Sequence, residues 1–211
     1  MDIAPFLFLV LSYLLGSVSG SLLLGRLRGV DIRTLGSGNA GGTNALRTQG
    51  VAFGLGTVLV DVGKGALVAA GARWALVGEA WPLACVFAAV CGHVWPVFHG
   101  FRGGKGAATV VGGLAVLWPQ ALPAVLLTWL AALACGGYVG LSTVLAGISL
   151  PIYGWLADAT AARMVFAVAV AVFLVYTHRS NLQRLRAGRE PRFERARVLG
   201  RWWAARGRRV R

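Results

Sequence analysis

Charged residues are scarce in this sequence of 211 residues, and acidic residues are scarcer than basic ones, with 7 Asp and Glu against 21 Lys and Arg. Asp, Glu, Lys and Arg make up 13% of the chain, whereas soluble domains carry about 25%. Hydrophobic residues make up 57%, a composition that excludes a disordered chain and argues against an ordinary water-soluble domain. The relevant unit of length is therefore the membrane-spanning helix of about 20 apolar residues.

The sequence also lacks the residue patterns of metal sites and of covalent catalysis. Its three cysteines form no CxxC pair, and an odd number cannot be fully paired within one chain. It contains no carboxylate pair, no His-x-x-x-His spacing and no G-x-S-x-G motif. We therefore expect an enzyme or transporter of this sequence to use neither a metal nor a cofactor.

Positive charge is abundant but unevenly distributed. The formal net charge is +14, and 12 of the 21 Lys and Arg residues are arginines that follow His178. No charged residue lies between Lys105 and Asp158. This distribution first indicates a basic cytoplasmic tail that contacts anionic lipid, and nucleic-acid binding is the weaker alternative.

Apolar segments separated by helix breakers predict an all-α, polytopic membrane protein with about seven spans. The N-terminal apolar run has no basic residue before it, so we expect a membrane span here and not a cleaved signal peptide. The predicted spans cover residues 3–24, 51–72, 82–98 and four pieces of 107–177, divided near 118–120, 136–142 and 157–163. A five-span division is the main rival.

The arginine distribution also predicts the orientation of these spans. Residues 25–50, residues 99–106 and the C-terminal tail carry most of the basic residues, and the intervening connections carry few. An odd number of spans then places the N-terminus outside and the C-terminus in the cytoplasm. The glycine-rich polar loops would all share the cytoplasmic face.

The first polar loop, "GSGNAGGTN" at residues 36–44, has the composition of an anion-binding loop. Its successive glycines allow backbone N–H groups to converge on an oxyanion. Ser37, Asn39, Thr43 and Asn44 add neutral donors, and Arg47 adds a guanidinium suited to phosphate. The alternative is a flexible turn at the membrane exit, followed by a helix N-cap.

The second polar loop, "GHVWPVFHGFRGGKGAAT" at residues 92–109, combines glycines with a lysine. Its "RGGKG" segment leads directly into a helix predicted to begin at Ala107. Glycine N–H groups, a lysine and a helix N-terminus together form an anion site. The alternative for Lys105 is that it anchors the helix end at the membrane surface.

Two further polar segments follow in the apolar second half of the chain. In "GGYVGLST" (136–143), Ser142 would either cap the following helix or join the site. In "THRSNLQRLRAGRE" (177–190), His178 and Asn181 would share one face of a continued helix, with Arg184 one turn further on. Alternatively, His178 is an anchor at the membrane interface.

Asp61 and Lys64 are ionisable residues inside the second predicted span. Such groups usually face the interior of a helix bundle and are either paired or functional. Their i, i+3 spacing would also allow them to neutralise each other across one helical turn. The sequence leaves a functional site and a structural pair as equal alternatives.

Taken together, the four polar motifs resemble those of the bacterial membrane acyl-phosphate:glycerol-3-phosphate acyltransferases, in order and spacing over residues 1–190. Gly42 replaces the alanine of the family pattern, and Gly140 stands where a serine is common. The resemblance implies one integral-membrane acyltransferase domain, 1–190, in the bacterial cytoplasmic (inner) membrane. It says nothing about 191–211, an Arg-rich extension that we expect to be cytoplasmic.

The activity implied by the resemblance is the first step of phospholipid synthesis. An acyl chain would pass from acyl phosphate to the 1-hydroxyl of glycerol 3-phosphate, giving lysophosphatidate and inorganic phosphate. The expected partners are these two substrates, the lipid bilayer and an upstream acyltransferase that makes acyl phosphate, and no nucleic acid. An organic-phosphate transporter is the strongest rival function, and a structural protein that recruits anionic lipid is the third.

The resemblance and the residue chemistry together give a set of candidate site residues. The candidate catalytic residues are His178, Asn181, Ser142, Lys105 and Arg47. The candidate phosphate-binding residues are Ser37, Gly38, Asn39, Gly41, Gly42, Thr43, Asn44, Gly103, Gly104, Lys105, Gly106 and Thr109. Asp61, Lys64, His93, Arg102, Arg184 and Glu190 are expected to support them. The general base would be either an oxygen of a substrate phosphate or His178.

Overall fold

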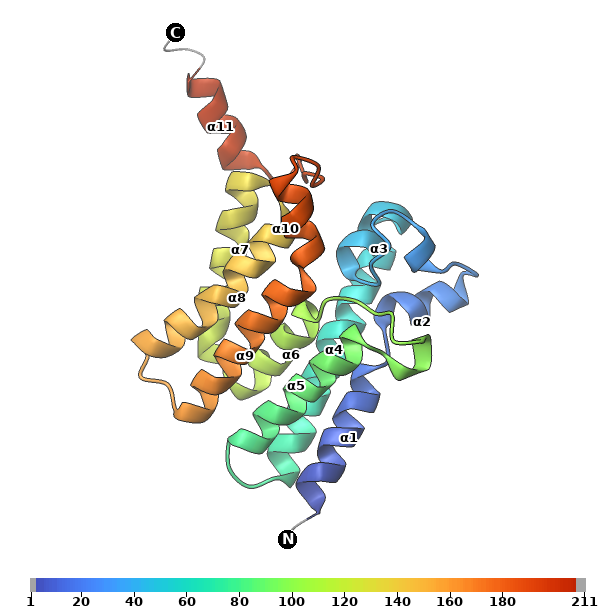
Figure 1. The fold of residues 1–211 in the computed structure, drawn as a ribbon, viewed down its shortest axis with the longest axis vertical. Helices are drawn as coiled ribbons and strands as arrows, with labels where there is room; N and C mark the ends of the chain where they lie inside the picture. Colours follow the sequence, from blue (N-terminus) through green and yellow to red (C-terminus); the bar gives the residue numbers. More distant parts are fainter. Residues whose placement is uncertain (1–2, 208–211) are drawn as a thin grey trace. The chain divides into compact units, whose positions relative to one another are not determined.

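The computed structural model describes residues 3–207, and in this range all regular elements are helices (Figure 1). These residues divide into two compact units. The first unit contains the residues up to Leu122 together with Thr160–Phe166. The second contains Pro123–Ala159 and the residues from Ala167 onward. The predicted all-α membrane fold is confirmed, and the units are described separately.

The first unit is a bundle of helices joined by two polar loops. Its helices are α1 (Ala4–Gly16), α2 (Gly20–Leu27), α3 (Gly42–Gln49), α4 (Val51–Ala75), α5 (Ala80–Val94) and α6 (Ala107–Leu117), with short 3-10 turns η1 (Ile32–Thr34), η2 (Val97–His99) and η3 (Pro119–Ala121). α4 packs against α6 and α2, and α1 packs against α5 (Figure 1). The start of α9 (Ala161–Thr177) joins this unit, where Arg163 Nε lies 2.6 Å from Glu79. Thr160 donates to the same carboxylate.

Glycines allow the backbones of α4 and α6 to touch. A Cβ on Gly65 would lie 2.2 Å from the carbonyl oxygen of Thr109, and one on Gly112 would lie 2.0 Å from that of Val62. Such close approach maximises van der Waals contact between helices in lipid, where there is no hydrophobic drive for association. The contact fixes where α6 begins, and therefore where the second polar loop ends.

The first predicted span, 3–24, is not one continuous helix. α1 and α2 are separated at Ser17–Ser19 and meet at an angle of 45°. The sequence prediction missed this break because the segment is apolar on both sides of it. Its physical cause lies in α4, whose Lys64 and Asp61 side chains bond to the freed backbone groups, as described below.

The second unit contains α7 (Leu122–Gly136), α8 (Val139–Leu156), most of α9 (Ala161–Thr177), α10 (Arg179–Arg186) and α11 (Val198–Gly207). α8 packs against α9 at Gly147, where a Cβ would lie 3.0 Å from Leu174. The helix predicted to continue through His178 is instead bent by 54° between α9 and α10. The extension 191–211 includes α11, and residues 208–211 lie outside the described residues.

The predicted division of 107–177 into four helical pieces is confirmed, with breaks at the predicted breakers. The count of seven spans is not confirmed. In the described residues, four helices are long and apolar enough to cross a membrane, or up to six if each bent pair forms one span. The predicted span that does not qualify is α6, because its 11 residues fall well short of the roughly 20 needed to cross a bilayer.

Candidate functional site: two joined glycine loops and a polar helix junction

The first polar loop is organised around the side chain of Asn44. Its Nδ2 donates to the carbonyls of Ile32, Leu35 and Asn39, at 3.1, 2.9 and 3.1 Å. Its Oδ1 accepts from the backbone N–H of Ser37 at 2.9 Å. Asn44 is buried, with 3% of its surface exposed. The loop is therefore an ordered structure and not a flexible membrane-exit turn.

The other predicted donors of this loop are more accessible than Asn44. Ser37, Gly38 and Arg47 are exposed, whereas Asn39, Gly41, Gly42 and Thr43 are half-buried. α3 begins at Gly42, with Gly41 as its N-cap and no side-chain capping bond. The first-turn N–H groups of α3 therefore adjoin the loop donors, an arrangement that favours binding of an anion.

The second polar loop is tied to the end of α5 and to the first loop. Gly103 N–H donates to Val94 O and Gly104 N–H donates to His93 O, both at 3.1 Å. Gly103 O in turn accepts from Ala40 N–H at 3.4 Å. The two glycine-rich loops predicted to share one face thus contact each other directly.

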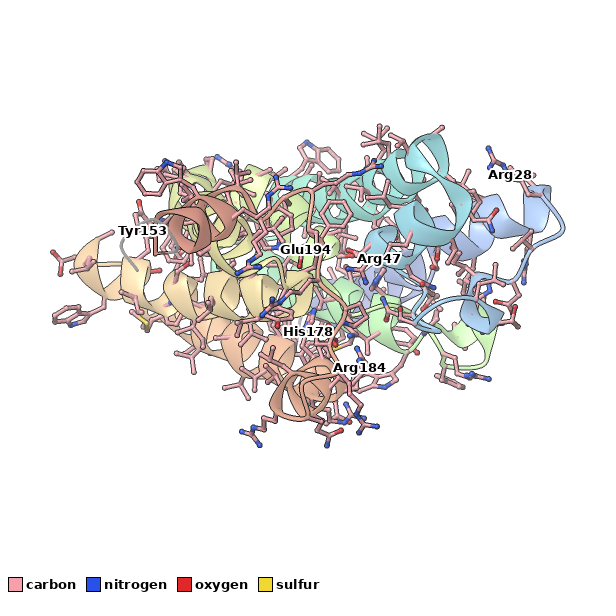
Figure 2. All side chains as sticks on the ribbon, turned by 90° about the horizontal axis from the view of Figure 1, so that it is seen from above. Arg28, Arg47, Tyr153, His178, Arg184 and Glu194 are labelled. Carbon is pink, nitrogen blue, oxygen red and sulfur yellow. The ribbon has the colours of Figure 1, made fainter. Side chains whose placement is uncertain are left out.

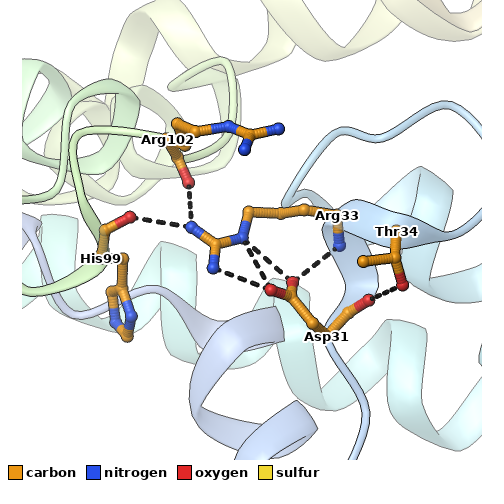
Figure 3. A network of polar contacts seen from close by, with 5 residues as sticks. All are labelled: Asp31, Arg33, Thr34, His99 and Arg102. Carbon is orange, nitrogen blue, oxygen red and sulfur yellow. Dashed lines mark hydrogen bonds and ion pairs between the residues drawn. The ribbon is translucent and has the colours of Figure 1, made fainter.

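Arg33 makes a second connection between the two loops (Figure 3). Its Nη1 donates to His99 O at 2.8 Å and to Arg102 O at 3.3 Å, both in the second loop. Its Nε and Nη2 bond to the carboxylate of Asp31 at 2.8 to 3.2 Å. The planar guanidinium can satisfy all these acceptors together because its N–H groups form a rigid fork.

This ion pair shifts the pKa of both partners. Hydrogen bonds from the side chain and backbone of Arg33 lower the pKa of Asp31 from an ordinary value of 3.8 to about 2. The hydrogen bond with Asp31 raises the pKa of Arg33. Both groups are therefore ionised throughout the physiological range, and the connection between the loops does not titrate near neutral pH.

The second loop ends where α6 begins, at the predicted Ala107. Gly106 is the N-cap, with φ of 90°, a left-handed conformation that favours glycine. Lys105 precedes it and is half-buried, and Arg102 is exposed. Thr109, in the first turn of α6, is fully buried against α4. Lys105 thus lies beside the positive end of a helix dipole, which favours an anion there.

Asp61, Lys64 and His93 meet beneath these loops, each with no more than 3% of its surface exposed. Lys64 Nζ lies 3.1 Å from Asp61 Oδ1 and 2.8 Å from His93 Nδ1. The ion pair that the i, i+3 spacing of Asp61 and Lys64 allowed is therefore formed. The sequence did not predict His93 as their third partner, since it comes from α5 and not from α4.

The candidate residues of the second unit gather where α8 begins and α10 begins. Asn181 Nδ2 donates to Glu190 Oε1 at 2.6 Å, and Arg184 Nε lies 2.7 Å from Glu190 Oε2. A Cβ on Gly140 would lie 2.7 Å from the side chain of Asn181. Because residue 140 is glycine and not a larger residue such as serine, the side chain of Asn181 can lie directly against the start of α8.

Ser142 and His178 are both buried and bonded to helix backbone. Ser142 Oγ donates to Tyr138 O at 2.9 Å from within α8, whose N-cap is Tyr138, so Ser142 does not cap this helix. His178, labelled in Figure 2, is the N-cap residue of α10. Its Nδ1 lies 2.8 Å from Leu174 O. A carbonyl accepts only from a protonated nitrogen, so this bond favours the tautomer with Nε2 unprotonated.

The C-terminal extension contacts the turn before α8. Arg192 Nε donates to Tyr138 Oη at 2.6 Å, and its guanidinium lies 4.9 Å from the centre of the Tyr138 ring. Phe193 N–H donates to Gly137 O at 2.7 Å. The extension thus holds the turn from which the Ser142 helix starts.

Besides the contact of His93 with the ion pair and the bend at His178, sequence reasoning missed two further features. Arg33 was read only as part of a positive-inside loop, although the Asp-x-Arg spacing with Asp31 signals a local ion pair. The break in the first span was also missed, although "GSVSG" at 16–20 is a run of small residues in an apolar segment. Within residues 3–207, no group of three or more His, Cys, Asp or Glu residues is placed to bind a metal.

Comparison with known proteins agrees with the motifs. The family model described as glycerol-3-phosphate acyltransferase matches residues 6–188. A glycerol-3-phosphate acyltransferase of Thermosynechococcus vestitus is 44% identical, over 88% of this chain and 93% of the relative.

Two crystal structures of PlsY (YgiH), an integral membrane glycerol 3-phosphate acyltransferase, have a similar fold. The glycerol 3-phosphate form is 33% identical with a TM-score of 0.85, over 90% of this chain and 96% of that one. The lysophosphatidic acid form is 32% identical with a TM-score of 0.85, over 93% and 98% of the respective chains. The chain therefore belongs to the glycerol-3-phosphate acyltransferase family of integral membrane enzymes.

Proposed function

We propose that this protein transfers an acyl chain from an acyl phosphate to the 1-hydroxyl of glycerol 3-phosphate, releasing lysophosphatidate and inorganic phosphate. The observation that carries the proposal is the junction of the two glycine-rich loops, where Ala40 N–H donates to Gly103 O. It gathers backbone N–H groups, Lys105 and the start of α6 in one region. The glycerol 3-phosphate and lysophosphatidic acid forms of PlsY support the assignment of acceptor and product.

Both proposed substrates carry phosphate, so the site has to stabilise two anionic groups. Arg47 and Lys105 offset the repulsion between them, and Ser37, Asn39, Thr43 and the loop N–H groups supply neutral donors. Because Nδ2 of Asn44 already donates within the loop, we assign Asn44 to the shape of the loop. Catalysis then depends on positioning and charge stabilisation.

In the reaction, the 1-hydroxyl oxygen of glycerol 3-phosphate attacks the carbonyl carbon of the acyl phosphate. A new ester C–O bond forms, the C–O bond to phosphate breaks, and phosphate leaves with the bonding electrons. The hydroxyl proton passes either to a phosphate oxygen of the substrate or to Nε2 of His178. The bond between His178 Nδ1 and Leu174 O supports the second route by favouring an unprotonated Nε2.

We assign Asn181, whose Nδ2 carries two hydrogens, to the glycerol phosphate and to the charge that develops during the attack. Ser142 Oγ already donates to Tyr138 O, so we assign Ser142 to the structure at the start of α8, and we assign His178 to the proton. Glu190 accepts from both Asn181 and Arg184, so it fixes the direction in which the Asn181 amide points. This assignment predicts that Glu190→Gln weakens binding of glycerol 3-phosphate through Asn181, because the charged acceptor is lost.

We further propose that the protein lies in the bacterial cytoplasmic membrane, with its N-terminus outside and its C-terminus inside. The concentration of arginines in the tail supports this orientation. Acyl phosphate is an activated lipid, so an upstream acyltransferase that produces it is the expected partner. Residues 1–190 form the acyltransferase domain, and 191–211 form a cytoplasmic extension that stabilises the turn at Tyr138.

Phosphate release by the purified protein in detergent tests this function directly. Palmitoyl phosphate is supplied with and without glycerol 3-phosphate, in the presence of a chelator. We expect release that depends on glycerol 3-phosphate and survives chelation. Release without the acceptor would indicate a phosphatase, and no release from folded protein would favour an organic-phosphate transporter.

The His178→Ala variant decides between the two proton acceptors. If His178 is the general base, turnover falls by about 100-fold or more at unchanged protein stability. Near-normal turnover would assign the proton to a phosphate oxygen of the substrate.

A further inference from the structure

The buried Asp61–Lys64–His93 cluster has a second set of partners, in the backbone of the broken first span. Lys64 Nζ donates to Gly16 O at 2.9 Å and to Val18 O at 2.7 Å. Asp61 Oδ1 accepts from Gly20 N–H at 3.1 Å. In a continuous helix, Gly20 N–H would donate to Gly16 O. The ion pair of α4 is thus inserted into one backbone hydrogen bond of the first span.

This insertion explains why two charges are buried here. Unpaired backbone groups inside a membrane protein are costly, and so is an ion pair removed from water. Here the ion pair and the freed backbone groups satisfy one another. Lys64 supplies donors to the freed carbonyls, and Asp61 supplies an acceptor to the freed N–H. Mutual neutralisation of the two charges would not require these backbone contacts.

The broken segment in turn bonds to the start of the second polar loop. Tyr13 Oη donates to Trp95 O at 2.7 Å, and Val97 N–H donates to Ser17 Oγ at 3.3 Å. A straightened first span would move Ser17 and displace its contact with Val97 N–H. The position of the break therefore determines the position of the loop that contains Lys105.

His93 connects the ion pair to the loop glycines. Its Nδ1 lies 2.8 Å from Lys64 Nζ and 3.4 Å from Asp61 Oδ1. With Lys64 charged, the ammonium has hydrogens and no lone pair, so Nδ1 accepts from it and Nε2 carries the imidazole hydrogen. Nε2 lies directly under the loop, since a Cβ on Gly104 would be 2.1 Å from it. The imidazole ring thus packs against Gly104, the residue that directly precedes Lys105.

We propose that Asp61, Lys64 and His93 are positioning residues that keep the first span broken and thereby hold the Lys105 loop in its phosphate-binding position. The inference rests on the proposed function for its kinetic consequence. Its structural consequence, a loop ordered by the buried cluster, is measurable without any turnover.

The decisive variant replaces both charges, Asp61→Leu with Lys64→Met. Replacing a buried ion pair with apolar residues is often tolerated, and the Gly16–Gly20 hydrogen bond can then form within one continuous helix. We expect a folded protein whose KM for glycerol 3-phosphate rises by about 10-fold or more. We also expect faster hydrogen–deuterium exchange at residues 95–106 and slower exchange at Gly20.

Gly63→Ala is the matched control, because Gly63 lies in the same helix and a Cβ there meets nothing within 4 Å. It should leave both KM and exchange unchanged. A folded double variant with wild-type KM and wild-type exchange at 95–106 would overturn the proposal. If the wild-type protein shows no turnover, the proposed function fails, and the exchange measurement still tests the positioning.

A pair of His93 variants tests the same inference with the ion pair intact. His93→Asn keeps a hydrogen-bond acceptor for Lys64, whereas His93→Ala removes it. We expect His93→Ala to raise the KM for glycerol 3-phosphate and to speed exchange at 95–106, with His93→Asn restoring both in large part. Wild-type values for both measurements in His93→Ala would overturn the role of His93.

Discussion

The pairs Asp31–Arg33 and Asp61–Lys64 are both formed by residues close in sequence, and both hold the backbone of another segment. Arg33 binds two carbonyls of the second loop, and Lys64 binds two carbonyls of the first span. Their surroundings differ, since the side chain of Asp31 is 42% exposed and that of Asp61 is 2% exposed. Water can replace the lost partners of the first pair but not those of the second.

The difference in exposure indicates that the Asp61–Lys64 pair contributes to the stability of the fold, whereas the Asp31–Arg33 pair contributes to the geometry of the site. An exposed ion pair contributes about 0–1 kcal/mol, because solvent screens it. Breaking a buried pair costs far more, because the remaining charge has no partner. We therefore expect the buried cluster to control stability, and the exposed pair to control mainly the geometry of the loops.

The largest expected effect is that of Lys64→Met alone. It leaves the Asp61 carboxylate buried without its cation, which should destabilise the protein by about 3–5 kcal/mol. Unfolding in detergent measures this loss, with the Asp61→Leu/Lys64→Met double variant as the control. Equal stability of the single and double variants would show that the Asp61 charge is not confined to a dry environment.

Gly104→Ala tests the place where the buried cluster reaches the loop. The new Cβ would lie 2.1 Å from His93 Nε2 and 2.9 Å from Ala40 O, so the loop has to move. We expect kcat/KM to fall by about 100-fold. Gly71→Ala is the control, since a Cβ at Gly71 meets nothing within 4 Å. Unchanged kinetics would place the loop outside the site.

Arg33→Ala should have a smaller effect, mainly on substrate binding. It removes the bonds to His99 O and Arg102 O, and the KM for glycerol 3-phosphate should rise by about 10-fold at nearly unchanged stability. Arg33→Lys should restore little of the loss, because an ammonium cannot reproduce the guanidinium fork. Full restoration by lysine would mean that charge alone matters at this position.

The smallest effect is the response of the exposed pair to pH. The pKa of Asp31 is lowered to about 2, so its contribution is fully present above its ordinary pKa of 3.8 and is lost as pH falls through about 2. Hydrogen exchange at residues 31–34 should therefore show no pH-dependent opening between pH 5 and 8, once corrected for intrinsic rates. Opening within that range would contradict the ion pair.

Much of the candidate site could be predicted from sequence because its determinants are local. Glycine spacing predicted the two loops, and "RGGKG" predicted the start of α6 at Ala107. Asn181, Arg184 and Glu190 were all proposed, and the structure brings them together. The precise partners were not predictable, since Asn44 bonds within its own loop and Ser142 bonds back to Tyr138 O.

The breaks at Ser17–Ser19 and at His178 could not be predicted with the same methods. The first lies inside an apolar run and the second at the end of one, and in both places hydropathy reports length and composition but not continuity. The first break exists because Lys64 and Asp61 on α4 replace a hydrogen bond within the first span. A prediction from local sequence cannot detect these contacts, because Lys64 and Asp61 are more than 40 residues from their backbone partners in the first span.

The sequence by itself determined the membrane environment and the helical class, and it predicted the two glycine-rich loops as phosphate-binding segments. These properties follow from composition and from residues that act within a few positions of one another. Only the tertiary structure decided how the buried charges are used, because contacts among α1, α2, α4 and α5 place Lys64, Asp61 and His93 at one point. In a medium without water, a backbone group freed in one helix must find its partner on another.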